Sequence, residues 1–506
     1  MYFILKSPDN TNENNMILPF TIKDANLTEY INRELEPKEK EKNEFGEVFT
    51  PLHLIHEMLD KLDAHYTQEK KKSIFSEKSY TWFDPACGIG NFPIVVYQRL
   101  MEGLKSEIPK EENRRKHIIE NMLFMSELSA RNVAICRKIF CEDVYQVNIH
   151  KGNTLSLDVN QKWNIQSFDI IVGNPPYNAG GIRSKKEKNI STVSTVWPKF
   201  ITYSLDILKQ NGYLAFINPL SWLRKSYSVH STLLEKHIVW LKLWDNNHSK
   251  TIINARIPIS LFVLHNRVNV EKRKTEIESQ LKNAHIKSKS FEYLDKEHSI
   301  PLAFYSIFKK LRKFIEQHNL ELKYETKTLR SSRNNPTISI PDSYTISDRL
   351  AIHTYTMKEG LKVKKLNVRH PDANKPKLIL ANKSGFHGAF IDDGRLGLVG
   401  GEKIYILGPD LNKLKPVFAF KIAYLIVNLT KYRMDILDTV AYYYIPDIRK
   451  CDMTESELYE KIGFSNAELD IINRYGRHYN GKRKYPTKKI SQIRRKHIKT
   501  KKIKYF

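Results

Sequence analysis

Residues Trp82-Phe83-Asp84-Pro85-Ala86-Cys87-Gly88-Ile89-Gly90-Asn91-Phe92 predict a β-strand that turns sharply into a helix. Gly88 and Gly90 allow the backbone to turn tightly and to approach a ligand closely. The helix that begins beyond them offers free amide groups at its N-terminus. In an α/β sheet, such a turn after the first strand is where cofactors bind, although the segment alone is equally compatible with a plain tight turn.

On both sides of this turn, short apolar runs alternate with helical patterns. Strands are predicted near residues 80–83, 122–126, 146–149, 168–172, 213–217, 239–244 and 259–264, and helices near 92–104, 129–140, 195–209 and 221–236. Strands separated by helices require crossover connections, which produce a mostly parallel sheet covered on both faces. We therefore predict an α/β fold with a doubly wound, mostly parallel, seven-stranded sheet of Rossmann-like type.

The length of 506 residues and the hydrophobic content of 41% are sufficient for two cores. We expect a lead-in over 1–43, the α/β domain over 44–270, a charged linker over 271–300 and a mixed α+β domain over 301–506. The last of these ends in a basic segment.

The chain carries 83 Lys and Arg against 56 Asp and Glu, a formal net charge of +27. Such a charge favours a polyanionic partner, nucleic acid before an anionic membrane surface, although a Lys-rich genome would also raise it. No acidic residue occurs after Gly476. A solvated tail is the alternative to DNA-phosphate contact by its basic residues, whose candidates are Lys482, Arg483, Lys484, Lys488, Lys489, Arg494, Arg495 and Lys496.

The four cysteines form no Cys-x-x-Cys pair, and no apolar run is long enough to span a bilayer. We therefore expect reduced thiols, no metal site, no membrane contact and a cytoplasmic location.

Polar residues follow the second and third predicted strands. Glu127 stands where a carboxylate can accept hydrogen bonds from both ribose hydroxyls of an adenosyl group, although an isolated Glu at a strand end is more often simply solvated. Asn153 follows the third strand, where its amide could address an adenine edge.

The fourth predicted strand leads into Val172-Gly173-Asn174-Pro175-Pro176-Tyr177. Two prolines cannot continue a central strand, so they predict a rigid loop at the edge of the sheet. Such a loop can direct the Asn174 side-chain oxygen and the Pro175 carbonyl at one amino group, with Tyr177 as a flat face. A turn stiffened by proline with a packed tyrosine is the simpler alternative for this tetrapeptide alone.

Together, Asp84 to Phe92 and Asn174 to Tyr177 resemble the cofactor-binding and catalytic motifs of the amino-group DNA methyltransferases. Phe45 to Pro51 is similar to the additional upstream motif of that family, and the order of the motifs is similar to its gamma arrangement. The resemblance covers roughly residues 44–265. Its Asn-Pro-Pro-Tyr form goes mainly with methylation of adenine N6.

The resemblance implies a class I methyltransferase fold that binds S-adenosyl-L-methionine and methylates a flipped adenine in double-stranded DNA. The implied catalytic residues are Asn174, Pro175, Pro176 and Tyr177. The expected cofactor-binding residues are Phe45, Thr50, Pro51, Asp84, Pro85, Ala86, Gly88, Gly90, Asn91, Glu127 and Asn153. Phe262 is the candidate for a second aromatic wall against the base, and the C-terminal half would recognise the target sequence.

Several alternatives remain open at this point. The same tetrapeptide serves RNA methyltransferases and enzymes that methylate a glutamine amide in release factors, but the upstream motif and the basic C-terminal half favour DNA. A DNA-binding specificity protein with an inactive methyltransferase fold is a further alternative. A restriction system with a cognate endonuclease on a separate chain is compatible with the sequence.

Overall fold

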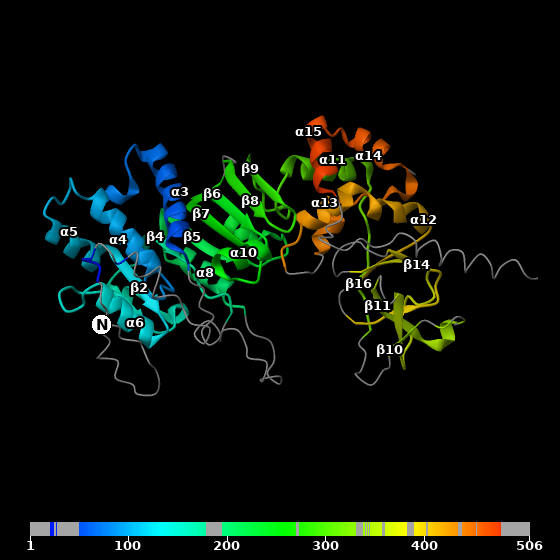
Figure 1. Ribbon diagram of the computed structural model, residues 1–506, viewed down its shortest axis with the longest axis horizontal. Helices are drawn as coiled ribbons and strands as arrows, with labels where there is room; N and C mark the ends of the chain where they lie inside the picture. The colour runs from blue at the N-terminus through cyan, green and yellow to red at the C-terminus, as the bar shows by residue number, and fades with distance from the viewer. Residues whose placement is uncertain are drawn as a thin grey trace, which may run out of the picture.

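The computed structural model describes most of the chain. The described residues are 21–24, 27, 50–178, 195–269, 273–329, 337–339, 341, 343, 345–356, 360–381, 389–400, 403–433, 438–451 and 453–476. Figure 1 shows the chain as a large sheet with helices on its faces, followed by a second group of helices and two smaller sheets.

The large sheet has nine strands in the order β3-β2-β1-β4-β5-β7-β6-β8-β9. In chain order they are β1 (Trp82–Asp84), β2 (Leu123–Glu127), β3 (Ile149–Lys151), β4 (Phe168–Gly173), β5 (Leu208–Pro219), β6 (Lys236–Trp244), β7 (Ile259–Val268), β8 (Thr275–Leu281) and β9 (Ile286–Glu292). Strands β1 to β5 pair in parallel, whereas β7 is antiparallel to both β5 and β6. The predicted doubly wound, mostly parallel sheet is therefore confirmed, but with nine strands instead of the predicted seven, because β8 and β9 extend it.

Helices cover both faces of this sheet. They are α3 (Leu52–Lys70), α4 (Asn91–Gly103), α5 (Glu111–His117), α6 (Ala130–Ile139), α7 (Val159–Trp163), α8 (Trp197–Asp206), α9 (His230–Leu234) and α10 (Asn246–Ile253). Successive residues of a strand point to opposite faces of the sheet. Where helices cover both faces, neighbouring residues in the strand must therefore all be apolar. In β5, Leu214 and Phe216 enter one core and Ala215 and Ile217 the other. Helix α8 packs on the first core, and α3, α4 and α6 pack on the second.

The prediction of a linker over 271–300 is wrong for most of these residues, because β8 and β9 extend the large sheet there. Strand β8 pairs in parallel with β6, and β9 pairs antiparallel with β8. Alternate β8 residues are buried, while Glu276 and Glu278 bind Lys61 of α3 at 2.5 and 3.0 Å. The charged residues that suggested a linker therefore occupy one face of a strand whose other face is buried.

The C-terminal half combines helices with two smaller sheets. The helices are α11 (Tyr305–His318), α12 (Leu411–Leu414), α13 (Lys421–Leu429), α14 (Glu455–Ile462) and α15 (Asn466–Tyr475). One sheet orders β10 (Thr337–Ser339), β12 (Gly360–Lys365), β11 (Leu350–Thr356) and β15 (Gly397–Leu398). The other orders β14 (Phe390–Asp392), β13 (Lys377–Ala381) and β16 (Lys403–Leu407). This half is mixed α+β, as predicted.

One hydrophobic core runs from the large sheet into the C-terminal helices. It includes Phe83 of β1, Phe308 and Leu311 of α11, and Leu425 of α13. A smaller separate core is formed by buried residues of both small sheets, among them Ile352 of β11, Val363 of β12 and Tyr405 of β16. No described helix combines the length and the apolar composition that crossing a bilayer requires.

Between α11 and α12 the chain leaves the helical group for the two small sheets and then returns to it. The backbone of Glu325, near the start of this excursion, pairs with that of Tyr405, near its end, through hydrogen bonds of 2.8 and 3.0 Å. The chain therefore enters and leaves the small sheets at adjacent points.

Candidate active site

The carboxyl ends of three neighbouring strands bring the predicted site residues to one edge of the large sheet. Strands β2, β1 and β4 lie side by side and run in parallel, so their last residues share an edge. Asp84 ends β1, Glu127 ends β2, and Asn174 directly follows β4. Such an edge, beside a change in strand order, is where open α/β sheets bind ligands.

The turn after β1 has the backbone conformation that its glycines predicted. Gly88 and Gly90 have φ angles of +55° and +95°, which residues with a side chain rarely adopt. A Cβ atom built on Gly88 would meet no described atom within 4 Å, whereas one on Gly90 would lie 3.3 Å from Cys136 Sγ. Gly90 is thus needed for packing against α6, and Gly88 faces space that no atom of the described residues fills.

The Glu127 carboxylate is fixed by the backbone on either side of that space. Its Oε2 accepts a hydrogen bond of 2.9 Å from the Gly88 amide, and its Oε1 accepts one of 2.8 Å from the Ser129 amide. Burial raises the pKa of this carboxyl, and the amide donors partly offset that effect. Since each carboxylate oxygen has two lone pairs, acceptor capacity remains for a bound ligand.

Asp84 lies beneath the turn and is almost fully buried. Its Oδ1 accepts a hydrogen bond of 3.0 Å from the Ala86 amide, while its Oδ2 is buried with no hydrogen-bond partner among the described residues. Burial, together with the negative charge of Glu127, raises the pKa of Asp84 to about 8. A buried carboxyl oxygen without a partner is costly unless a ligand supplies a donor or positive charge there.

Thr50, from the upstream segment, joins the glycine turn to the loop after β4. Its side-chain hydroxyl accepts a hydrogen bond of 3.1 Å from Asn174 Nδ2, and its carbonyl accepts one of 3.1 Å from Asn91 Nδ2. Pro51 is the N-cap of α3, which starts immediately afterwards. Thr50 is buried, and Phe45 lies outside the described residues.

The loop after β4 is compact. Pro175 is buried, and the Tyr177 ring packs partly buried against both cores of the sheet. The Tyr177 hydroxyl is buried without a hydrogen-bond partner in the described part of the chain, and burial raises its pKa. A backbone bridge joins Asn178 to Thr195, so the polar segment between them begins and ends beside Tyr177.

Two residues that sequence reasoning passed over hold this edge together. Thr154 Oγ1 donates to the Pro85 carbonyl at 2.6 Å and lies 2.7 Å from Ser126 Oγ, so it ties the segment after β3 to β2 and to the glycine turn. A Cβ on Gly173 would lie 2.8 Å from Asp84 Oδ1, which allows only glycine there. The sequence could have revealed the role of Gly173, because a glycine at the end of a strand is often required where another part of the chain approaches the backbone closely.

Other expected residues stand apart from this group. Asn153 is exposed and its Oδ1 accepts a hydrogen bond of 3.2 Å from the Leu155 amide, so its role towards adenine stays a prediction. The expectation that Phe262 forms an aromatic wall is wrong. Phe262 is fully buried at the centre of β7 with its ring 6.0 Å from that of Trp222, because the apolar run 259–264 is covered on both faces. The basic candidates from Lys482 to Lys496 lie outside the described residues.

Comparison with known proteins finds a similar family for part of this region. The model of the Eco57I restriction-modification methylase family matches residues 96–256, which include the segment from Glu127 to Tyr177. An uncharacterized adenine-specific methylase of Mycoplasma pneumoniae is 23% identical over 38% of this chain and 58% of its own length. The type II restriction enzyme and methyltransferase RM.Eco57I of Escherichia coli is 23% identical over 40% of this chain and 26% of its own length.

The chain therefore spans little more than half of the first relative and about a quarter of the second. Among solved structures, the type IIL restriction-modification enzyme MmeI in complex with DNA matches with a TM-score of 0.47 and 12% identity, over 90% of this chain and 79% of that chain. The M protein of the type I restriction enzyme EcoKI matches with a TM-score of 0.35 and 16% identity, over 46% of this chain and 48% of that chain.

Proposed function

We propose that this chain, which belongs through residues 96–256 to the restriction-modification methylases of the amino-group DNA methyltransferase family, methylates adenine N6 in double-stranded DNA. The observation that carries the proposal is that four motif residues are joined by hydrogen bonds at one edge of the sheet. Asn174 is bonded to Thr50, and Glu127 to the Gly88 amide, across neighbouring strand ends. This arrangement pairs a ligand-binding turn with a rigid acceptor loop.

The residues at this edge fit S-adenosyl-L-methionine. The open space over Gly88 admits a ligand against the backbone, and the fixed Glu127 carboxylate can accept hydrogen bonds from two ribose hydroxyls. The buried Asp84 Oδ2 would gain a positively charged neighbour. When bound, this cofactor supplies an electrophilic methyl group. We propose that these residues hold it together with Phe45, Thr50, Pro51, Pro85, Ala86, Gly90, Asn91 and Asn153.

Asn174 and Pro175 would position the amino group that receives the methyl. The adenine amino nitrogen is a poor nucleophile because its lone pair is delocalised into the ring. Asn174 Nδ2 donates to Thr50, which fixes the plane of the amide and the direction of its oxygen. Two hydrogen bonds from the amino group, to Asn174 Oδ1 and the Pro175 carbonyl, would favour a tetrahedral nitrogen. Such positioning and charge placement are the main sources of catalysis where no covalent enzyme intermediate forms.

The target base must leave the duplex before this loop can reach it, at a cost of a few kcal/mol. Stacking on an aromatic ring offsets about 1–3 kcal/mol of that cost per base. Tyr177 follows Pro176 directly and its ring is partly exposed, so we propose that it stacks on the flipped adenine.

The C-terminal half would supply sequence recognition and phosphate contacts. We propose that the basic segment from Lys482 to Lys496 contacts the DNA backbone, which positions a protein without specifying sequence. A restriction endonuclease on a separate chain is the partner we propose, because one relative carries both activities in its name.

The test uses the purified full chain with tritiated S-adenosyl-L-methionine and, separately, unmethylated genomic duplex DNA, total RNA and a protein extract. Digestion of the labelled product and mass spectrometry then identify the modified residue. We expect N6-methyladenine in DNA, and its loss in Asn174→Ala while cofactor binding persists. Label in RNA or protein alone, or none in DNA across many sequence contexts, would contradict the proposal.

A further inference from the structure

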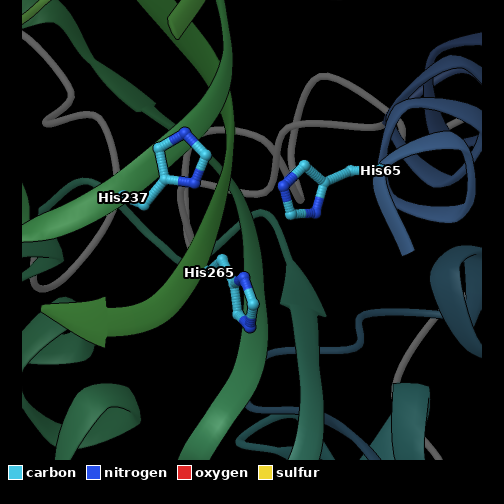
Figure 2. Close-up of side chains that lie close together, drawn as sticks. All are labelled: His65, His237 and His265. Carbon is cyan, nitrogen blue, oxygen red and sulfur yellow. The ribbon is translucent and has the colours of Figure 1, made fainter. Parts of the chain in front are cut away.

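Three histidines from distant parts of the chain meet at the opposite end of the large sheet. His65 lies on α3, His237 on β6 and His265 on β7, and one candidate ligand atom from each lies within 4.8 Å of the other two. Figure 2 shows the three imidazole rings arranged around a common space, with His65 facing the two strands. The ring centroids of His237 and His265 lie 5.5 and 5.4 Å from that of His65.

Two of these imidazoles have one nitrogen held by an outer partner. His65 Nδ1 lies 2.9 Å from the Tyr213 hydroxyl, and His237 Nε2 lies 3.4 Å from the Lys274 carbonyl. The Nδ1 atoms of His237 and His265 are buried, and neither has a hydrogen-bond partner within the described ranges. Metal-binding histidines show this division, in which an outer group orients the ring and the other nitrogen faces the ion.

We propose that His65, His237 and His265 bind a divalent transition-metal ion of the Zn²⁺ type at a structural site. Three imidazole nitrogens favour such ions over Mg²⁺ or Ca²⁺, which prefer oxygen ligands. Zinc to nitrogen bonds of about 2.0–2.1 Å place two tetrahedral ligand atoms about 3.4 Å apart. The imidazole nitrogens lie within 4.8 Å of one another, so small side-chain rotations that move them by little more than about 1 Å would bring them to zinc-binding distance. The sequence predicts no metal site because its cysteines form no Cys-x-x-Cys pair, and the proposed site departs from that expectation.

Glu69 provides the fourth group beside the cluster. Its carboxylate oxygens lie 3.8 Å from His65 Nε2 and 3.9 Å from His265 Nδ1. Arg267 and Arg273 bind its Oε1 at 2.6 and 3.3 Å, which holds the carboxylate against the two rings.

The position of the cluster favours a structural role. Tyr213, which contacts His65, precedes Pro219 at the catalytic edge by six residues of β5, about 20 Å along an extended strand. An ion there would join α3 to β6 and β7, at the end of α3 remote from Thr50. It would stabilise the fold and take no part in methyl transfer.

The test measures metal binding by the full chain, prepared without a polyhistidine tag and stripped with a chelator. We expect one equivalent of Zn²⁺ by competition with a chromophoric chelator, and a Co²⁺ absorption spectrum typical of four-coordinate nitrogen and oxygen ligands. His237→Asn and His265→Asn should each weaken zinc binding by at least about 100-fold, and Tyr213→Phe by about 10–100-fold, since outer partners contribute that much. His56→Asn, on the same helix but outside the cluster, should keep wild-type affinity.

Zinc should also raise the melting temperature of the wild type and of His56→Asn, but not of His265→Asn, with circular dichroism as the check that each variant is folded. Failure of the folded wild type to bind one equivalent of Zn²⁺ would overturn the proposal. So would equal zinc affinity in His56→Asn and in folded His237→Asn. Neither result bears on the proposed methylation, because metal binding is measured without DNA or cofactor.

Discussion

The two ends of α3 contact two polar clusters of opposite character. At its start, Thr50 joins a site built from backbone amides, carboxyl groups and an amide side chain around open space. About 20 Å further along the helix, His65 enters a closed cluster of stacked and tilted rings. The first arrangement suits a ligand that must enter and leave, and the second suits an ion that remains. Substitutions should therefore separate the clusters, with turnover sensitive to the first and metal content to the second.

The largest effect is expected for Asn174→Ala, which removes the side-chain oxygen that we propose accepts a hydrogen bond from the reacting amino group. We expect single-turnover methylation to fall by about 10²–10³-fold, as for removal of other preorganised groups at a reacting centre, with cofactor and zinc affinities unchanged. Asn160→Ala on the surface of α7 is the matched control and should keep the wild-type rate. A rate within tenfold of wild type would exclude Asn174 from the chemistry.

Glu127→Gln should separate cofactor binding from metal binding. Loss of the charge weakens the hydrogen bonds that the carboxylate accepts, and bonds to charged groups contribute about 1.5–3 kcal/mol each. We expect the dissociation constant for S-adenosyl-L-methionine to rise by about 10–100-fold in a titration without DNA. Glu102→Gln, on the exposed face of α4, should bind normally, and equal affinity in the two variants would remove Glu127 from the site.

Asp84→Asn tests whether the candidate active site is destabilised in the absence of ligand. Burial raises the pKa of Asp84 to about 8, above its unfolded value, so the folded state retains the proton more tightly. Its contribution to stability is therefore fully present at acid pH and is lost as pH rises from about 4 through about 8.

Urea unfolding of the cofactor-free protein at pH 5.5, 7 and 8.5 measures this effect. We expect the wild type to lose free energy of unfolding relative to Asp84→Asn across the series, and the variant to bind cofactor more weakly. Parallel pH curves for the two proteins would show that Asp84 is already ionised in the folded state.

The smallest effect is expected for Thr50→Val, which removes the acceptor for Asn174 Nδ2 and keeps the side-chain shape. A typical hydrogen bond contributes about 1 kcal/mol, so kcat/KM for methylation should fall about fivefold. Thr67→Val, near the far end of α3, removes a hydrogen bond of similar length and should leave kcat/KM unchanged. An equal loss in both variants would indicate a general effect of α3 rather than positioning of Asn174.

The two clusters also differ in how far the sequence alone predicts them. Asp84, Gly88, Gly90 and the loop from Asn174 belong to contiguous motifs at strand ends, so local patterns and the order of strands were sufficient to place them. The three histidines are separated by up to 200 positions along the chain, and no local pattern relates them. Their meeting depends on the antiparallel pairing of β6 with β7, which the sequence alone did not reveal.

Two errors have related physical causes. Strand β8 carries alternating buried and exposed residues, but its many charges concealed the alternation and suggested a linker. Phe262 was placed at the active site because it follows the motifs in sequence, although an unbroken apolar run favours a strand covered on both faces. In both cases the decisive information was the burial of each face, which depends on neighbours distant in the chain.

The chain enters and leaves the two small sheets beside the paired backbones of Glu325 and Tyr405, so these sheets could be transplanted as one segment. A segment whose ends meet can be exchanged between homologous frameworks without moving the framework, whereas a cut over 271–300 would divide β8 and β9 from their sheet. The helices on either side share the core of the large sheet and belong to the recipient, and a graft must also match the side chains of β13 and β16 that reach the same core. The natural cassette for grafting therefore runs from about residue 325 to 408, which keeps β16 whole, and is carried as one piece between α11 and α12.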